Sequence, residues 1–287
     1  MEIHLASMEN ATCWAFRKLF PVTDSYTGMM SANYLVKRSK AWKEVDTFHI
    51  EGQKQWLQIA TSRVEEVREL VGRLKRELEA DKSKELYGIE LNASCPSPFV
   101  CNLGQGAALV KRITRVKDLV NELLRSGFRV GVKVRLGLNY EEARRGVIFP
   151  LLEELEKIKD PNFSHVAVHF KHAKEPSDTG YDYEILKKIS EFDVPLVING
   201  GLRNYRDFNN IMKTLKPGNR KKIRGLMIGR EVFENPNCFV EINNILNKTL
   251  LSERSLDEFK REFEENCKIH EPKEIYLKTL HQMARWI

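Results

Sequence analysis

Short apolar runs rich in β-branched residues alternate along the chain with longer charged segments in which apolar residues recur at three- and four-residue steps. The first pattern is typical of buried strands, and the second of helices that pack one face against a sheet. Eight runs predict strands at Ile3–Ala6, Val22–Thr27, Trp56–Ile59, Leu86–Leu91, Val130–Val134, His165–His169, Leu196–Ile198 and Gly225–Ile228. The helical pattern between them is clearest over Val64–Glu79, Ala107–Leu124, Glu141–Lys157 and Tyr205–Leu215.

The alternation of eight strands with helices predicts parallel βα units and suits a closed (β/α)8 barrel, the TIM-barrel fold of the α/β class. An open doubly wound sheet is the alternative, but the first predicted strand is followed by ASMENATCW rather than GxGxxG. Strand signals stop after about Glu241. We therefore expect a barrel over residues 1–240 and a short C-terminal helical domain over residues 241–287, with helices at Ser255–Cys267 and Pro272–Trp286.

Composition indicates the cellular compartment and the kinds of partner to expect. The 287 residues include five dispersed cysteines without a CxxC pair, so neither a disulfide framework nor a metal site is expected. No apolar run is long enough to span a bilayer, which predicts a soluble protein without a membrane partner, in a reducing, cytoplasmic compartment. The net charge of +7 permits a polyanionic partner without requiring one. Monomer and dimer both stay open.

Candidate chemistry gathers where the predicted strands end. Catalytic groups of such barrels lie at the carboxyl ends of the strands and in the loops that follow. Most residues at these positions are polar and would be costly to bury in an apolar core, and the others are Met8 and three glycines. Together they are Ser7, Met8, Gln58, Asn92, Cys95, Lys133, Arg135, His169, Lys171, Asn199, Gly200, Gly201, Gly229 and Arg230.

Two of these segments predict a phosphate site. VINGGL and LMIGRE end the seventh and eighth strands, where barrels often bind phosphate. Glycine lets backbone N–H groups approach an anion closely, and Arg230 adds a charged partner. Lys133 and Arg135 alternate along VKVRLG and so point to one face of their strand. That face is either the mouth of the barrel or a solvated strand end.

The stretch LNASCPSPFVCNLGQG places Cys95 before a proline, in a loop just past a strand. Pro96 stiffens this loop, and Asn92 could orient a ligand from the strand end. Cys95 could act as a nucleophile with a lowered pKa or as a neutral proton donor. The residues alone leave both roles open.

Basic residues divide between the two ends of the predicted barrel. Arg220, Lys221 and Lys222 precede the eighth strand and therefore belong to the face opposite the candidate site. Cations after strands six and seven are better placed for a polyanion. These are Lys171, Lys174, Arg203 and Arg206.

Taken in order, the motifs resemble those of the tRNA-dihydrouridine synthases, FMN-dependent (β/α)8 barrels with a C-terminal helical domain. The resemblance runs from LASMENATCWAFRKLF through TGMMSAN, NASCPSPFVCNLGQGAAL, VKVRLG, the His169 region and VINGG to GLMIGREVFENP, roughly over residues 3–240. It implies reduction of specific uridines in tRNA to 5,6-dihydrouridine. Reduced FMN would give hydride to uracil C6, Cys95 would give a proton to C5, and NADPH or NADH would reduce the flavin again.

The resemblance also implies roles for single residues. Ser7, Met8, Gln58, Lys133 and His169 would contact the flavin, with Lys133 beside the ring edge where negative charge develops on reduction. Asn199, Gly200, Gly201, Gly229 and Arg230 would hold the flavin phosphate. Asn92, Arg135 and Lys171 would face the substrate, and Cys95 would be the general acid. The target uridine would have to leave its stack to reach the flavin.

Three segments depart from the family pattern. The usual opening APMxGVTD reads ASMENATC, with Ser7 for proline and Cys13 for the acid. The family's TEM reads Thr27-Gly28-Met29, and HxRT reads His169-Phe170-Lys171-His172. Two alternatives therefore accompany the main hypothesis: a small-molecule flavin enzyme of the dihydroorotate dehydrogenase type, and a non-catalytic RNA- or flavin-binding barrel.

Overall fold

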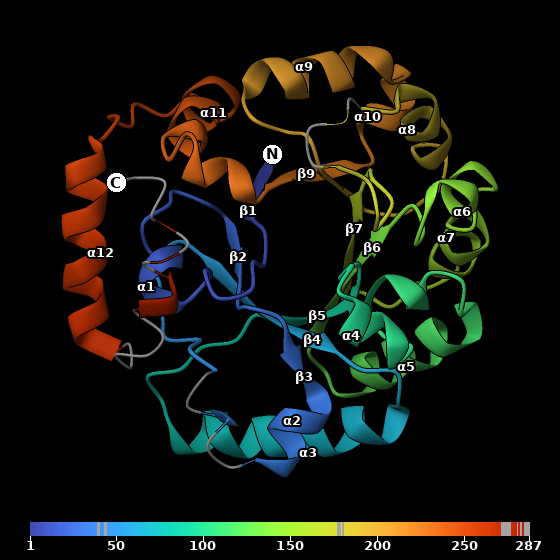
Figure 1. Ribbon diagram of the computed structural model, residues 1–287, viewed down its shortest axis with the longest axis horizontal. Coiled ribbons are helices and arrows are strands. Elements are labelled where there is room, and N and C mark those ends of the chain that lie inside the picture. The colour runs from blue at the N-terminus through green and yellow to red at the C-terminus, as the bar shows by residue number, and fades with distance from the viewer. Residues whose placement is uncertain are drawn as a thin grey trace.

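The computed structural model describes residues 1–38, 41–42, 45–176, 179, 181–270, 277–279, 281 and 283. Eight parallel strand positions close a ring in which each strand pairs with the next and the last returns to the first (Figure 1). The strands are β1 (Glu2–Leu5), β2 (Asp24–Tyr26), β4 (Lys54–Ala60), β5 (Gly88–Ala93), β6 (Arg129–Arg135), β7 (Phe163–His169), β8 (Leu196–Asn199) and β9 (Ile223–Ile228). The predicted (β/α)8 barrel is confirmed.

The second strand position is interrupted. β2 pairs with the start of β4, and the two-residue strand β3 (Met30–Ser31) pairs with its end at Ile59 and Ala60. The predicted strand Val22–Thr27 is therefore shorter than expected and is followed by a second piece. Between the two pieces, residues 27–29 form part of the rim at the carboxyl ends.

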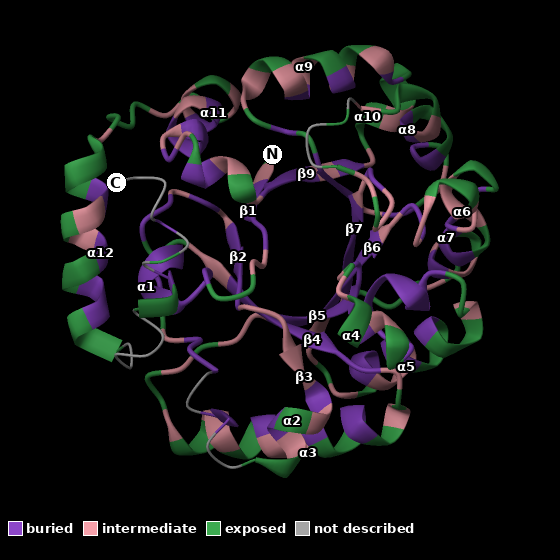
Figure 2. Ribbon diagram, viewed as in Figure 1, coloured by how far each residue is buried: buried purple, intermediate pink, exposed green. Residues whose placement is uncertain are grey.

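Helices surround the ring and turn their buried faces toward it (Figure 2). They are α1 (Trp14–Arg17), α2 (Ala32–Lys37), α3 (Val64–Ala80), α4 (Pro98–Asn102), α5 (Ile113–Arg125), α6 (Tyr140–Arg144), α7 (Phe149–Leu155), α8 (Tyr183–Ile189), α9 (Tyr205–Thr214), α10 (Pro217–Arg220), α11 (Cys238–Leu246) and α12 (Leu256–His270). The 3-10 turns η2 (Gly106–Leu109) and η3 (Arg230–Phe233) follow β5 and β9.

Two predicted helices are broken in the structure. The helix expected over Glu141–Lys157 splits into α6 and α7 because Gly146 has a φ of +68°, which ends a right-handed helix. The helix expected over Ala107–Leu124 begins as the 3-10 turn η2 and becomes α-helical only at Ile113. Arg112 has a non-helical ψ of 61°, so the helix cannot run continuously from η2 into α5.

The hydrophobic core has two parts. The larger lies between the strands and the helices, and the smaller fills the barrel interior with Ala6, Tyr26, Trp56, Ala167, Val197 and Met227. Residues that point into the ring alternate along each strand with residues that face the helices. The interior also holds several fully buried polar side chains, which matter for the site described below.

The region after β9 packs against the barrel. Phe259 and Phe263 of α12 are fully buried and contact the rings of Phe20 and Phe16 respectively. The expected helix Ser255–Cys267 corresponds to α12, whereas Pro272–Trp286 lies almost wholly outside the described residues. The expected domain boundary at residue 240 falls inside α11. None of the helices described is long and apolar enough to cross a lipid bilayer.

Candidate active site

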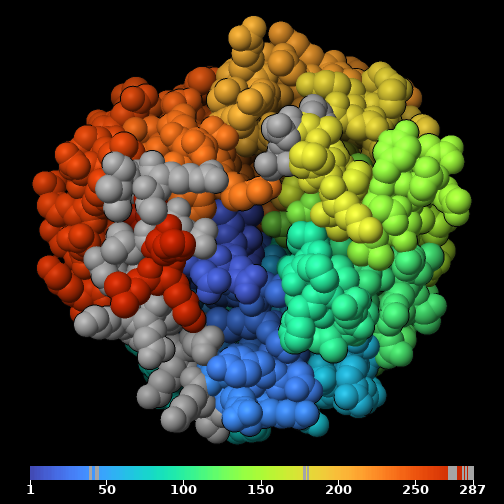
Figure 3. Space-filling model, viewed as in Figure 1, coloured from blue at the N-terminus to red at the C-terminus, as the bar shows by residue number. Residues whose placement is uncertain are grey.

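The carboxyl ends of all eight strand positions open on one face of the molecule. Seen from this face, the surface is hollowed near its centre, between the N-terminal segment in blue and the segment after β5 in blue-green (Figure 3). The carboxyl halves of β4 to β8 and the loops after β1, β5, β7, β8 and β9 carry the residues that the sequence singled out. Because the strands are parallel, residues far apart in sequence meet here.

Cations converge on this mouth. Lys133 and Arg135 lie on the same side of β6, and Lys133 is only 7% exposed. Burial, followed by the charges of Arg135, Lys133, Arg230 and Lys171, holds the pKa of His169 well below its usual range. His169 is therefore a neutral imidazole surrounded by positive charge.

Burial and mutual repulsion disfavour the charged forms of the cations at the mouth. Burial lowers the pKa of Lys133 to about 8, against the opposing attraction of Glu90. Burial, together with repulsion from Arg230, lowers the pKa of Arg135 to about 10. Within the described residues, Lys133, Arg135 and Arg230 have no carboxylate at ion-pair distance. A bound anion would relieve this repulsion.

The backbone at the ends of β8 and β9 has a conformation that lets a ligand approach it closely. Gly200 and Gly201 have φ values of +93° and +71°, in the left-handed region that glycine favours. A Cβ at Gly200 would lie 2.4 Å from Cδ2 of His169, so a larger residue cannot replace it there. The Asn199 amide donates to the carbonyl of Met227, 2.7 Å away, and so ties β8 to β9.

The loop after β1 closes the same side of the mouth. The carbonyl of Met8 accepts from the N–H groups of Ala11 and Thr12. Asn10 sits in this turn with a φ of +57°, a conformation that asparagine tolerates, at the position where the family pattern has glycine. A Cβ built on Gly229 would lie 3.7 Å from Sδ of Met8, which places these two predicted cofactor residues side by side.

Cys95 is held at the rim by its backbone. Its N–H donates to Oδ1 of Asn92 at 2.8 Å, and its carbonyl accepts from the N–H of Ala107 at 3.0 Å. The Cys101 thiol donates to the same carbonyl at 3.4 Å, which is a structural role. The Cys95 thiol is half-buried, and burial raises its pKa, so the sulfur carries a proton at neutral pH. Of the two roles left open by the sequence, proton donor fits this environment better.

Comparison with known proteins agrees with these motifs. The family model described as "Dihydrouridine synthase (Dus)" matches residues 4–285. The chain belongs to the dihydrouridine synthase family. A "Probable tRNA-dihydrouridine synthase" of Staphylococcus epidermidis is 28% identical over 153 residues, which cover 53% of this chain and 44% of that protein. A "Probable tRNA-dihydrouridine synthase 2" of Bacillus subtilis is 28% identical over 158 residues, covering 53% and 45% respectively.

A human relative, "tRNA-dihydrouridine(20a/20b) synthase [NAD(P)+]-like", is 26% identical over 157 residues, covering 53% of this chain and 45% of that protein. The matches thus span less than half the length of these curated relatives. Among solved structures, a variant of NCR from Zymomonas mobilis superimposes with a TM-score of 0.51 at 12% identity, covering 90% of each chain. A GH18 chitinase from Pseudoalteromonas aurantia gives 0.50 at 10% identity, covering 85% of this chain and 99% of the chitinase chain. These two likenesses concern the fold alone.

One departure from the family pattern has a structural replacement. Cys13 stands where the family opening has an acid, and its own side chain does not cap the start of α1. Oδ2 of Asp46 instead accepts from the N–H of Trp14 at 2.6 Å, while Oδ1 forms a buried ion pair with Arg17 at 2.9 Å. Sequence reasoning missed both residues because they are 29 positions apart.

The ammonium of Lys171 is buried against the backbone of its own loop. Lys171 is 3% exposed, and its ammonium donates to the carbonyls of Pro176 and Thr179 at 3.1 and 2.6 Å. In this family member, Lys171 therefore stabilises the loop after β7. Its predicted role in substrate binding stays a prediction, and that role would require the loop to rearrange.

Sequence reasoning also missed a set of polar side chains inside the barrel. Glu90, His165, Tyr26 and His4 are all fully buried and are joined by hydrogen bonds. A signal was available, because Glu90 and Asn92 are two residues apart in GIELNA and must face the same side of β5. A charged residue within a buried strand is costly unless it is paired.

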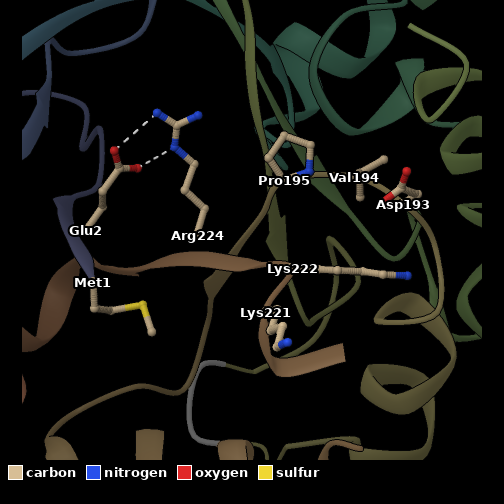
Figure 4. Close-up of a pocket in the computed structure, with 8 residues that line it drawn as sticks. All are labelled: Met1, Glu2, Asp193, Val194, Pro195, Lys221, Lys222 and Arg224. Carbon is tan, nitrogen blue, oxygen red and sulfur yellow. Dashed lines mark hydrogen bonds and ion pairs between the residues drawn. The ribbon is translucent and has the colours of Figure 1, made fainter. Parts of the chain in front are cut away.

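A different cleft, of about 640 Å³, opens at the amino ends of the strands (Figure 4). Its lining residues include Lys221, Lys222 and Arg224, with Arg224 paired to Glu2. The face opposite the candidate site was predicted for Lys221 and Lys222, and that placement is confirmed. This cleft is remote from Cys95, so we assign the chemistry of the family to the carboxyl-end mouth.

Proposed function

We propose that the chain is a flavin-dependent tRNA-dihydrouridine synthase that reduces uridine with Cys95 as the proton donor. The observation that carries the proposal is a protonated, half-exposed thiol at the rim of a mouth lined with cations that lack carboxylate partners. A reduction that delivers hydride to one carbon of uracil and a proton to its neighbour needs a hydride donor and an acid, and the unpaired cations favour a hydride donor that carries a phosphate.

The residues fit FMN on two observations. The cations Lys133, Arg135 and Arg230 repel one another, so a phosphate or an electron-rich ring would stabilise them. The Gly200–Gly201 turn lacks side chains at a point where backbone N–H groups can approach an anion. Asn199, Gly200, Gly201, Gly229 and Arg230 would hold the phosphate, while Ser7, Met8, Gln58, Lys133 and His169 would contact the ring. When bound and reduced by NADPH or NADH, the flavin would supply the hydride to uracil C6.

In the proposed reaction, the side chains of the protein supply one proton. The Cys95 thiol would transfer its proton to C5 of uracil, and the resulting thiolate would regain one from solvent. The raised pKa keeps the proton on sulfur before the reaction, and the nearby Arg135 charge favours the thiolate afterwards. Nε of Arg135 donates to the carbonyl of Ser94 at 2.7 Å and keeps the guanidinium beside this loop.

RNA as the substrate is supported by the surface around the mouth. Among residues whose burial is described, four aromatic side chains are exposed: Tyr34, Phe99, Tyr140 and Tyr183. All four lie in the first turn of helices that follow β3, β5, β6 and β7, on one arc of the rim. Aromatic rings stack on unpaired bases, and such stacking with basic neighbours is typical of RNA-binding surfaces.

Cations accompany these rings. Arg63, Arg112 and Lys174 are exposed on the same arc, at the starts of α3 and α5 and after β7. They would contact phosphates, which sets the strength of binding rather than its sequence preference. A tRNA crossing this arc could place a flipped uridine in the mouth.

The deciding experiment is anaerobic. Flavin-loaded protein is reduced, unmodified tRNA is added, and flavin reoxidation is followed together with the mass of tRNA fragments. Reoxidation with a gain of two hydrogens on one uridine would establish the activity and its position. A flavin that stays reduced with tRNA but is rapidly reoxidised by orotate-like acceptors would indicate the small-molecule alternative. Failure of the protein to bind flavin would contradict both.

A further inference from the structure

A chain of side-chain hydrogen bonds runs beneath the mouth and ends at the Cys95 loop. Glu90 of β5 lies within it, fully buried, and no step proposed so far uses it. Its Oε2 accepts from Nε2 of Gln58 at 2.5 Å. Oε1 of Gln58 in turn accepts from Nδ2 of Asn92 at 2.6 Å.

The far end of the chain fixes the orientation of each amide. Oδ1 of Asn92 accepts from the backbone N–H groups of Ser94 and Cys95 at 2.9 and 2.8 Å. Since both backbone groups are donors, the Asn92 atom that faces them must be oxygen, and its NH2 must face Gln58. The NH2 of Gln58 must then face the next residue, which has to be an acceptor. Glu90 is that acceptor.

Glu90 is itself held in place from below. Nε2 of His165 lies 3.2 Å from Oε1 of Glu90, and burial lowers the pKa of His165, so the ring is neutral. The Tyr26 hydroxyl lies 3.1 Å from the same nitrogen and 2.9 Å from Nδ1 of His4. Gly131 makes room for this arrangement, because a Cβ there would lie 2.5 Å from Cε1 of His165. The carboxylate therefore cannot turn away from Gln58 without breaking a buried network.

We propose that Glu90 is a positioning residue for the acid: by accepting from Gln58, it orients the Gln58 and Asn92 amides and thereby holds the backbone of Cys95. This inference rests on the proposed function of Cys95. Gln58 still has a second N–H and a second lone pair for the predicted flavin contact. Without an acceptor at position 90, Gln58 is free to turn over, and Asn92 loses the donor–acceptor pattern that fixes its loop.

The test compares the reactivity of two thiols in one protein. Site-resolved alkylation by iodoacetamide gives the ratio of rates at Cys95 and Cys101, the two half-exposed cysteines among the described residues. Glu90→Leu removes the acceptor, whereas Glu90→Gln keeps one. Glu66→Gln is the matched control, because Glu66 is also buried and accepts from Asn33 and Thr61 but has no link to Asn92.

In Glu90→Leu we expect the Cys95/Cys101 ratio to rise about fivefold or more, the change that corresponds to the loss of one net hydrogen bond. Dihydrouridine kcat should fall about tenfold while KM for tRNA stays unchanged. Glu90→Gln and Glu66→Gln should keep the ratio within about twofold of wild type. An unchanged ratio in Glu90→Leu, or an equal rise at Cys101, would overturn the proposal.

A second pair of variants tests the direction of the chain and remains informative if Glu90→Leu folds poorly. In Asn92→Asp, both side-chain oxygens at position 92 are acceptors. Gln58 must then turn its NH2 toward residue 92 and its oxygen toward Glu90. The Gln58 oxygen and the Glu90 carboxylate would repel each other, because neither has a proton to donate. Adding Glu90→Gln restores a donor at that point, whereas adding Glu90→Leu removes the charge without supplying one. We expect the thiol ratio to return to about wild type only in Asn92→Asp/Glu90→Gln.

Equal recovery in both double variants would show that charge relief, not the orientation of the amides, controls the loop, and would overturn the proposal. The thiol ratio needs no turnover. A failed assignment of Cys95 as the acid would appear instead as retained uridine reduction in Cys95→Ala, so the two failures are distinguishable.

Discussion

The two ends of the barrel interior are built from the same strands but neutralise their charges differently. At the amino end, Glu2 accepts from Lys54 at 3.0 Å and from Arg224 at 2.5 Å, and the Trp56 indole donates to Asp24 at 2.7 Å. At the carboxyl end, Lys133 and Arg135 have no carboxylate partner in the described structure, and Arg135 bonds only to backbone carbonyls. Charged groups at the amino end are thus paired within the protein, whereas the cations at the carboxyl end would gain a negative partner only from a bound ligand. In this barrel, stability and function thus occupy opposite ends of the same strands.

The largest effect is expected from removing the acid. In Cys95→Ala, dihydrouridine formation should fall by about 10²–10⁴-fold, the usual contribution of a positioned proton donor. Flavin occupancy and flavin reduction by NADPH should stay near wild type, because the proposed flavin contacts come from other residues and not from the Cys95 thiol. Single-turnover assays on tRNA and stopped-flow absorbance measure the two steps separately. Equal loss of both steps would contradict the assignment.

Lys133→Met should separate function from stability. Flavin affinity should fall at least about tenfold, since this variant removes the buried cation that we propose contacts the flavin. The flavin-free protein should become more stable by about 1–3 kcal/mol at pH 7, because the buried ammonium costs free energy there. The pKa of Lys133 is lowered from 10.5 to about 8. The gain should therefore shrink between these pH values, as wild-type Lys133 loses its proton in the fold.

Chemical denaturation at pH 7 and pH 10, without flavin, measures this gain. Flavin affinity is read from fluorescence quenching. A variant that is destabilised at pH 7 would mean that Lys133 already has a partner in the free protein, and the contrast between the two ends would disappear.

Phe99→Ala should affect only the encounter with RNA. Phe99 is 75% exposed, so its removal should leave stability unchanged, while KM for tRNA should rise about 5–100-fold through the loss of one stacking contact. Phe99→Trp should retain most of the affinity. Leu250→Ala is the matched control, because Leu250 is 99% exposed but lies between α11 and α12, outside the four helices that carry the exposed aromatic rings. A similar loss in both variants would rule out a specific stacking role.

The smallest effect on activity is expected at the amino end. Burial opposes ionisation of Glu2, but the nearby His4 ring and hydrogen bonds from Arg224 and Lys54 outweigh it and hold the pKa of Glu2 well below its usual range. Glu2→Gln should therefore lower stability by about 1–2 kcal/mol at neutral pH, with turnover unchanged. The difference should shrink as the pH falls below about 4.5, where the unfolded carboxyl binds a proton. Thermal melts of wild type and variant across pH 3–7 measure this difference in stability. A loss of kcat in Glu2→Gln would show that the amino end also contributes to activity.

The sequence predicted the architecture because strand runs and helical periodicity are local signals. It did not predict the break at Gly146, because a positive φ depends on the packing of Phe149 against that turn. The gathering of Lys133 and Arg135 was predictable from alternation along one strand. The buried role of Lys171 was not, because it depends on where the carbonyls of its own loop come to lie.

The polar interior shows the same division. Glu90 was overlooked since a single acid in an apolar run gives no indication of its partners, and His165 and Tyr26 come from other strands. Asp46 and Arg17 likewise pair across 29 residues. Local patterns predict elements and the edge at which they end, whereas partners across the barrel require the three-dimensional register of the strands.

The pairing of β1 with β9 has a consequence for synthesis. Residues Glu2–Leu5 reach their second neighbour only when Gly225–Ile228 have left the ribosome. At about 5–20 residues per second, this wait lasts roughly 10–40 s. During that time, the edges of the growing sheet are unpaired and His4 lacks part of its surroundings. Newly made chains should therefore depend on chaperones for longer than proteins of similar size with local topology, and ribosome-bound chains that end before β9 should be readily digested by protease.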